Sequence, residues 1–153
     1  MKARNLMTKD VASCGPDDPM ATAARIMWER DCGIVPVVDG DGRPVGVVTD
    51  RDLCMAALTR NEPLSRMAVR DAMARDLVTC REDDDEERVH GAMRKRQVRR
   101  LPVLGDDGRL VGMISLNDLI LAAAGKGGAE RRQHELARTA AEISRHREVA
   151  AAV

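Results

Sequence analysis

The feature that most constrains the fold is an internal repeat. When the chain is shifted by 66 residues it matches itself without a gap, and 16 of the 48 positions from 6 to 53 carry the same residue in the second copy. The best-matched stretch runs from Pro36 to Leu53 and corresponds to Pro102 to Leu119. Two copies at this long period predict a pair of similar units related by a pseudo-twofold axis, and not a solenoid of short repeats.

Each copy has the same predicted order of elements: strand, helix, strand, strand, helix. In the first copy Ala23, Ile26 and Met27 have the spacing of one buried helical face. Turns rich in Gly and Asp separate the two strands of a hairpin. The fold class is therefore α+β. The predicted elements are extended segments over 11–14 and 77–80, helices over 20–30 and 86–96, strands over 34–38, 45–48 and 110–114, and closing helices from 49 and 115.

The repeat also suggests how the chain divides. We expect a first unit over 1–60, a linker over 61–70, a second unit over 71–124, and a tail over 125–153 that starts with a Gly-rich break. In the tail Leu136, Ala140 and Ile143 recur at spacings of four and three. This pattern predicts a weak amphipathic helix, suited to a contact with a second chain and less to a coiled coil.

Composition excludes several classes of function. Lys and Arg number 25, Asp and Glu also 25, and the chain contains one Trp with no Phe or Tyr. The balance of charge removes the main electrostatic argument for a dedicated nucleic-acid binder, and with a single aromatic residue the stacking of bases is largely unavailable. The N-terminus is polar, and the longest clean apolar run, residues 119–124, is too short to cross a bilayer. We therefore expect a cytoplasmic protein without a membrane partner.

Neither a metal site nor a catalytic constellation is legible. The cysteines, at 14, 32, 54 and 80, form no CxxC or CxH pair, and the three histidines are scattered. In a reducing compartment such cysteines are expected to be small buried residues, although a redox switch is an alternative. No Ser/His/Asp or Cys/His arrangement can be recognised. We expect a protein that is not an enzyme and requires no cofactor.

The repeated segments Gly33 to Leu53 and Arg99 to Leu119, which close with Thr-Asp-Arg-Asp-Leu and Ser-Leu-Asn-Asp-Leu, resemble the tandem CBS domain pair. The resemblance covers about residues 5–124, and the layout is similar to small bacterial proteins that consist of a CBS pair alone, such as the hypoxic-response type. It implies two units packed through their sheets, two clefts for adenosyl ligands, and a regulatory role in a homodimer. Family ligands include AMP, ADP, ATP, S-adenosylmethionine and NAD-type dinucleotides, of which we expect AMP first.

The pairs Thr49/Asp52 and Ser115/Asp118 have two interpretations. A hydroxyl residue followed three positions later by an acid is typical of a helix N-cap. The same groups near a helix N-terminus could bind ribose hydroxyls and phosphate. The resemblance implies that they do both, with Asp52 or Asp118 on the ribose and Thr49 or Ser115 at the phosphate.

Further ligand contacts are implied by the resemblance. The strand segments before and at the repeated prolines would enclose the adenine, and Ser13 and Thr79 would form a lip. Arg100 would reach phosphate, while the first copy has Ile34 there and could use Arg51. We therefore predict unequal clefts, the one served by Arg100 preferring the more anionic ligand. The predicted ligand-binding residues are Ser13, Ile34, Val35, Pro36, Thr49, Arg51, Asp52, Thr79, Arg100, Leu101, Pro102, Ser115 and Asp118.

Two alternatives stay open. The basic run from Arg94 to Arg100 could bind nucleic acid, but it follows the acidic run from Glu82 to Glu87, and acids at the start of a helix with bases at its end complement the helix dipole. The protein could also be a dimeric scaffold whose caps only cap and whose clefts stay empty. The sequence does not name the protein effector that would read the signal.

Overall fold

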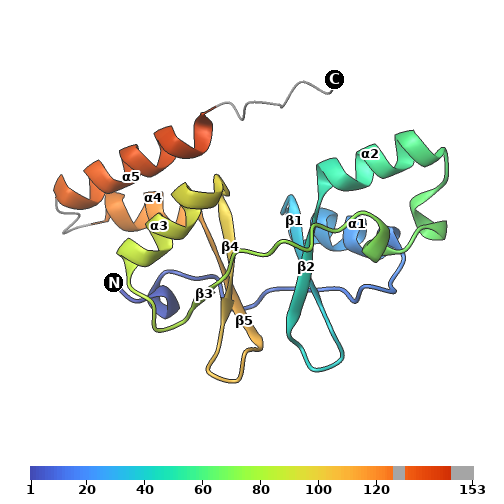
Figure 1. The fold of residues 1–153 in the computed structure, drawn as a ribbon, viewed down its shortest axis with the longest axis horizontal. Helices are drawn as coiled ribbons and strands as arrows, with labels where there is room; N and C mark the ends of the chain where they lie inside the picture. Colours follow the sequence, from blue (N-terminus) through green and yellow to red (C-terminus); the bar gives the residue numbers. More distant parts are fainter. Residues whose placement is uncertain (126–129, 146–153) are drawn as a thin grey trace.

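The computed structural model describes residues 1–125 and 130–145, and it shows two similar halves with their hairpins side by side and their helices outside (Figure 1). The helices are α1 (Met20–Glu29), α2 (Asp50–Arg60), α3 (Glu86–Arg96), α4 (Leu116–Ala124) and α5 (Glu130–Ser144). The strands are β1 (Ile34–Val38), β2 (Pro44–Thr49), β3 (Cys80–Arg81), β4 (Arg100–Leu104) and β5 (Leu110–Ser115). Short 3₁₀ turns are η1 (Ala3–Asn5), η2 (Leu64–Arg66) and η3 (Val69–Asp71).

The predicted α+β order is confirmed, with one difference in the first repeat. In the second repeat β3 pairs with β4 in parallel, and the Glu82 amide donates to the Leu104 carbonyl at 2.9 Å. In the first repeat the pairing is a single bridge between Cys14 and Val37. Position 16, which matches Glu82, is proline and has no N–H to donate, so the ladder stops there. The expected strand over 11–14 is therefore reduced to this bridge.

The two hairpins, β1–β2 and β4–β5, have the same register and meet at their tips. Gly42 and Gly108 turn the chain with φ of 78° and 79°, a conformation that favours glycine. The Leu110 amide of the second hairpin donates to the Gly42 carbonyl of the first at 3.0 Å. This contact joins the repeats at the end opposite the helices (Figure 1).

Each repeat completes its hydrophobic core with a segment that precedes the other repeat. Ala3 and Leu6 are buried in the core of the second repeat, whereas Met67, Val69 and Met73 are buried in the core of the first. Residues assigned to a linker over 61–70 thus belong in part to the first core, and the start of the chain belongs to the second. The repeats are interlocked, and their boundaries in space differ from those expected along the chain.

The exchanged segments lie directly against two glycines. A Cβ at Gly112 would be 2.8 Å from the Thr8 carbonyl oxygen, and one at Gly46 would be 3.0 Å from the Ala74 carbonyl oxygen. Thr8 and Ala74 form antiparallel bridges with Met113 and Val47. Glycine at these two matched positions lets the crossing backbone approach the strand.

Helix α5 folds back over α3 and α4 of the second repeat (Figure 1). Leu136 and Ile143 pack against the second core, and Thr139 is fully buried. The apolar face predicted for a second chain is therefore occupied within the chain. The parts of the tail over 126–129 and 146–153 lie outside the described residues. Within the described residues, no helix combines the length and the apolar character needed to span a bilayer.

Candidate functional site

Both predicted helix caps are present, and they have the same pattern of hydrogen bonds. The Thr49 amide and Oγ1 donate to Asp52 Oδ2 at 2.8 and 2.7 Å, and the Asp52 amide donates to Thr49 Oγ1 at 3.2 Å. The Ser115 amide and Oγ donate to Asp118 Oδ2 at 2.7 and 2.6 Å, and the Asp118 amide donates to Ser115 Oγ at 3.3 Å. Each is a complete capping box at the start of α2 or α4.

The capping role leaves half of each carboxylate available. Within the described residues, every hydrogen bond to the side chains of Asp52 and Asp118 is accepted by Oδ2, and Oδ1 has no partner. Both side chains are half-buried and line cavities. A carboxylate oxygen fixed in place by its neighbour, beside the positive end of a helix, is suited to accept hydrogen bonds from hydroxyl groups. Capping and ligand binding are therefore compatible in this geometry.

The Ser115 cleft is a cavity of about 350 Å³ at the start of α4. Its lining comes from both repeats, because the segment after Thr8 runs along β5 of the second repeat. The volume falls in the range of small-molecule sites. The first repeat contributes the apolar residues Val11, Ala12 and Ile34, and the second contributes the polar or charged residues Arg100, Ser115 and Asp118.

The Thr49 cleft is its counterpart at the start of α2 and has a volume of about 740 Å³. Leu77, Val78, Thr49 and Asp52 take the places of Val11, Ala12, Ser115 and Asp118, each 66 residues away. Ile34 and Arg100 line this cleft as well. The pseudo-twofold repeat thus produces two equivalent clefts, each built from both units.

Each cleft contains an ion pair whose residues were not among the predicted site residues. Arg30 Nη1 is 3.0 Å from Asp10 Oδ2 in the Ser115 cleft, and Arg96 pairs with Asp76 in the Thr49 cleft. Both pairs consist of positions that are identical in the two copies. That identity was the available signal, although it does not by itself distinguish a cleft residue from a structural one.

The structure brings together only part of the predicted site. Ile34, Thr49, Asp52, Arg100 and Pro102 line the Thr49 cleft, and Ile34, Arg100, Ser115 and Asp118 line the Ser115 cleft. The remaining predicted residues line neither cleft: the side chains of Val35 and Leu101 are fully buried in the two cores, Arg51 is exposed on α2, and the others are Ser13, Pro36 and Thr79.

One predicted asymmetry needs correction. Arg100 was expected to serve one cleft, but it lines both, together with its counterpart Ile34. The two residues occupy matched positions at the inner ends of β4 and β1, and a residue near a twofold axis faces both related sites. Any difference in charge between the clefts must come from residues that lie farther from this axis.

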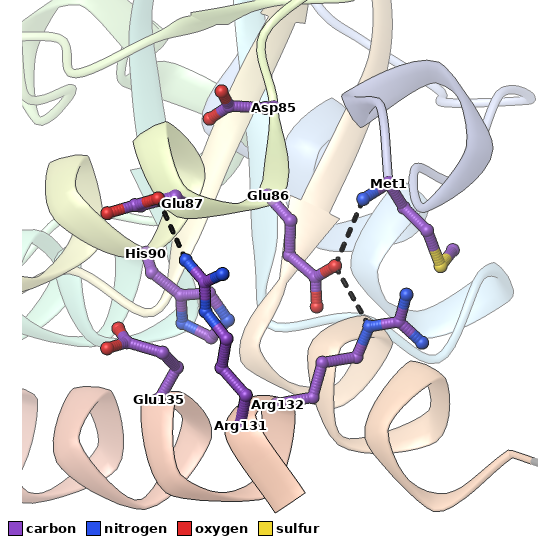
Figure 2. Close-up of a pocket in the computed structure, with 8 residues that line it drawn as sticks. All are labelled: Met1, Asp85, Glu86, Glu87, His90, Arg131, Arg132 and Glu135. Carbon is purple, nitrogen blue, oxygen red and sulfur yellow. Dashed lines mark hydrogen bonds and ion pairs between the residues drawn. The ribbon is translucent and has the colours of Figure 1, made fainter. Parts of the chain in front are cut away.

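A third cavity, of about 340 Å³, lies between the N-terminus, α3 and α5 (Figure 2). Its charged groups are paired with one another: Glu86 Oε2 is 3.2 Å from both the N-terminal amine and Arg132 Nε, and Arg131 is 3.4 Å from Glu87. Because these charges compensate each other, the cavity is better explained as the seam that holds α5 than as a ligand site.

The same seam contains the buried His90. Its Nδ1 is 2.8 Å from Thr139 Oγ1, and Arg94 Nη1 donates to Glu135 Oε2 at 2.7 Å. Burial lowers the pKa of His90, so the imidazole is neutral at pH 7. The hydrogen bond from Arg94 lowers the pKa of Glu135. These contacts attach α5 to α3 of the second repeat.

The expectation of small buried cysteines holds for Cys14 and Cys80, and it is wrong for Cys54. All four thiols are free, and burial raises the pKa of Cys14 to about 11 and that of Cys80 to about 12. Both are therefore protonated and unreactive near pH 7. Cys54 is exposed and Cys32 is half-buried. In the part of the chain that the structure describes, no three His, Cys, Asp or Glu side chains gather to hold a metal.

Comparison with known proteins finds one domain family in two places. The model of the CBS domain matches residues 3–59 and 69–125. The protein YlbB of Bacillus subtilis, described as uncharacterized, is 38% identical over 122 residues, which are 79% of this chain and 81% of that protein. Inosine-5'-monophosphate dehydrogenase of Methanocaldococcus jannaschii is 34% identical over 120 residues, or 78% of this chain. The chain spans only 23% of the length of that dehydrogenase.

Solved structures show the same fold. Hypoxic Response Protein I, crystallised with two coordinated zinc ions, has a TM-score of 0.72 at 26% identity, over 82% of this chain and all of that chain. The CBS domain pair of protein MJ0100, in complex with 5'-methylthioadenosine and S-adenosyl-L-methionine, has a TM-score of 0.70 at 24% identity, over 80% of this chain and 94% of that one. The second likeness concerns the fold alone.

Proposed function

The chain belongs to the CBS domain family, and from this premise we propose that it is a regulatory module that binds an adenosyl ligand in one or both clefts. The observation that carries the proposal is the geometry of Asp52 and Asp118, each of which caps a helix with one oxygen, while its other oxygen lies at a cleft and has no partner among residues 1–125 and 130–145. The MJ0100 pair shows that adenosyl compounds can be held by this fold in another protein.

The ligand is expected to bind with its sugar at the helix caps. The ribose hydroxyls donate to Oδ1 of Asp52 or Asp118. A phosphate lies near the hydroxyl of Thr49 or Ser115 and near Arg100, where the helix N-terminus and the guanidinium favour negative charge. AMP is the ligand we place first. The role is binding and not catalysis, since each hydroxyl–carboxylate pair is engaged in capping.

The adenine is expected to lie among aliphatic side chains, because the chain has no Phe or Tyr to stack on it. Val11 and Ala12 serve this purpose in the Ser115 cleft, and Leu77 and Val78 in the Thr49 cleft, with Ile34 in both. Ile34 was among the predicted site residues, whereas Val11, Ala12, Leu77 and Val78 were not. They come from the exchanged segments, whose position depends on the interlocked packing.

A signal follows from the way each cleft is built. Because both repeats contribute to both clefts, a ligand contacts two units at once and favours the arrangement that it binds more tightly. Its effect on that equilibrium is limited to its difference in affinity for the two arrangements. A protein effector, whose identity is open, would read the changed geometry.

We propose that the chain forms a homodimer through α1 and α2. Trp28 is 88% exposed and Leu58 is 72% exposed on this face. The position that matches Trp28 in the second repeat is Arg94, which α5 covers through Glu135. The second repeat thus has a polar contact between α3 and α5 at this position, whereas in the first repeat the matched position is apolar and no other part of the described chain covers it. A second copy presenting the same apolar face satisfies it by twofold symmetry.

Light scattering after gel filtration tests the dimer. We expect the wild type at twice the chain mass and Trp28→Asp at the mass of one chain. Leu121→Asp, which places the same charge at a residue 71% exposed on α4, is the matched control and should stay dimeric. A monomeric wild type, or equal dissociation by both substitutions, would overturn the proposed interface.

A thermal-melt series tests ligand binding. The protein is heated alone and with AMP, ADP, ATP, NAD or S-adenosylmethionine, after mass spectrometry has excluded a co-purified ligand. A ligand at 100 times its Kd adds about 2.7 kcal/mol of stability per site. At least one adenosyl compound should raise the melting temperature, and the rise should shrink in Asp118→Asn or Asp52→Asn. If no compound shifts the wild type, the alternative of a ligand-free dimeric scaffold is favoured.

A further inference from the structure

The matched positions of the two repeats differ sharply in charge between the first helix and the following strand. Residues 95–100 (Lys-Arg-Gln-Val-Arg-Arg) contain four bases and no acid. Residues 29–34 (Glu-Arg-Asp-Cys-Gly-Ile) contain two acids and one base. The internal repeat makes each copy a control for the other, because the backbone is similar while the side chains have changed.

Only part of this difference reaches the clefts. Arg30 and Arg96 contribute equally to the two clefts, because each lines its own cleft and is paired with an aspartate. Arg100 lines both clefts and distinguishes neither. Lys95 and Arg99 line the Thr49 cleft alone.

These two cations are also available. Lys95 and Arg99 are exposed, and neither they nor Arg100 form an ion pair with any of the described residues. The positions that match Lys95 and Arg99 in the first repeat are Glu29 and Gly33, and neither residue lines the Ser115 cleft. The Thr49 cleft is also about twice as large, at about 740 against about 350 Å³.

We infer that the Thr49 cleft selects an adenosyl ligand with a polyphosphate chain, whereas the Ser115 cleft takes an adenosyl ligand with at most one phosphate. The inference rests on the proposed function and specifies the ligand class of each cleft. Lys95 and Arg99 are the residues that distinguish the clefts, because they add positive charge and hydrogen-bond donors beyond the cap, where a chain of phosphates would extend. The larger volume leaves room for that chain.

The two clefts can be measured separately by removing one ribose acid at a time. Asp118→Asn leaves the Thr49 cleft intact, and Asp52→Asn leaves the Ser115 cleft intact. Each variant is titrated calorimetrically with adenosine and with metal-free ATP at low ionic strength. In Asp118→Asn, ATP should bind about tenfold more tightly than adenosine, as expected for two exposed cations on a polyphosphate. In Asp52→Asn, where the remaining cleft has Arg100 but neither Lys95 nor Arg99, the ratio of ATP to adenosine affinity should be at least about threefold smaller.

The repeat itself supplies the substitutions that test the two cations. Lys95→Glu and Arg99→Gly install the residues of the first copy, and in the Asp118→Asn background they should weaken ATP by about tenfold together while changing adenosine less than about twofold. Arg66→Ser removes one exposed positive charge outside both clefts and is the matched control for Arg99→Gly, which also removes one, whereas the two cleft substitutions together change the charge by three units. High salt should reduce the preference for ATP and leave adenosine binding unchanged.

The outcomes separate the two proposals. If adenosine and ATP bind neither variant nor the wild type, the proposed function fails. If both clefts bind but show the same ratio of ATP to adenosine affinity, the inference is overturned while the proposed function stands. The inference is also overturned if Arg66→Ser weakens ATP as much as the Lys95 and Arg99 substitutions do.

Discussion

Replacing Gly112 by alanine should displace the exchanged N-terminal segment and thereby weaken ligand binding in the cleft that this segment lines. The new Cβ would lie 2.6 Å from Met7 Sδ and 2.8 Å from the Thr8 carbonyl oxygen. The Met7 side chain can rotate away, but the Thr8 carbonyl is backbone. It accepts from the Met113 amide at 3.0 Å, and the Thr8 amide donates back at 2.9 Å. The segment must therefore move as a whole.

The cost can be bounded from overpacking in other cores. A single added methyl group against fixed backbone destabilises by about 1–3 kcal/mol, which lowers the melting temperature of a chain this size by about 2–10 °C. The displaced segment continues into Val11 and Ala12, which wall the Ser115 cleft. Ligand affinity should therefore fall at this cleft and stay unchanged at the Thr49 cleft.

The assay combines thermal melting with calorimetric titration, and the internal repeat provides the crossed control. Gly46→Ala places a Cβ 3.0 Å from the Ala74 carbonyl oxygen and should weaken the Thr49 cleft instead. Gly91→Ala adds a Cβ that would have no heavy atom within 4 Å outside its chain neighbours and its own helix backbone, and it should stabilise α3 by about 0.5–1 kcal/mol. The reasoning is refuted if Gly112→Ala melts with the wild type, or if both clefts weaken equally.

Two other predictions concern titratable groups. Burial lowers the pKa of His90, which faces Glu86 and Arg94 on α3 and Glu135 on α5, so the unfolded chain binds a proton that the folded chain resists. The free energy of unfolding should therefore fall as pH decreases through about 6.5, measured by urea titration, and an equally steep fall in His90→Asn would contradict this. Iodoacetamide at pH 8 should label the exposed Cys54 well before Cys80, whose thiol has a pKa of about 12. Labelling of both at one rate would refute the protection.

Local sequence signals determined most of the secondary structure. The Thr49 and Ser115 caps, the Gly-Asp turns and the helical spacing of Ala23, Ile26 and Met27 are interactions between near neighbours, and the structure contains the elements they predict. The missing ladder bond in the first repeat was also readable, since proline at position 16 has no amide proton. The predicted strand over 11–14 was too long because the prediction did not take this proline into account.

The exchange of segments could not be predicted from those signals. Met67 and Val69 lie in a segment whose composition is typical of a linker. They are nevertheless buried in the first core, because the chain crosses between the repeats before each unit. Hydrophobic pattern shows that a residue will be buried, but not in which of two similar cores. The residues that wall the clefts, such as Val11 and Leu77, were missed for the same reason.

The position of Arg100 shows a general limit of comparing repeats by sequence. Aligning the copies reveals that an arginine matches Ile34, which suggests that one cleft is charged and the other is not. In space the two matched positions lie near the pseudo-twofold axis, and each borders both clefts. A change there alters both sites alike, whereas Lys95 and Arg99 lie farther out and border one site. Specificity between two sites in a pseudosymmetric pair must therefore come from positions away from the axis, and only a structure shows which these are.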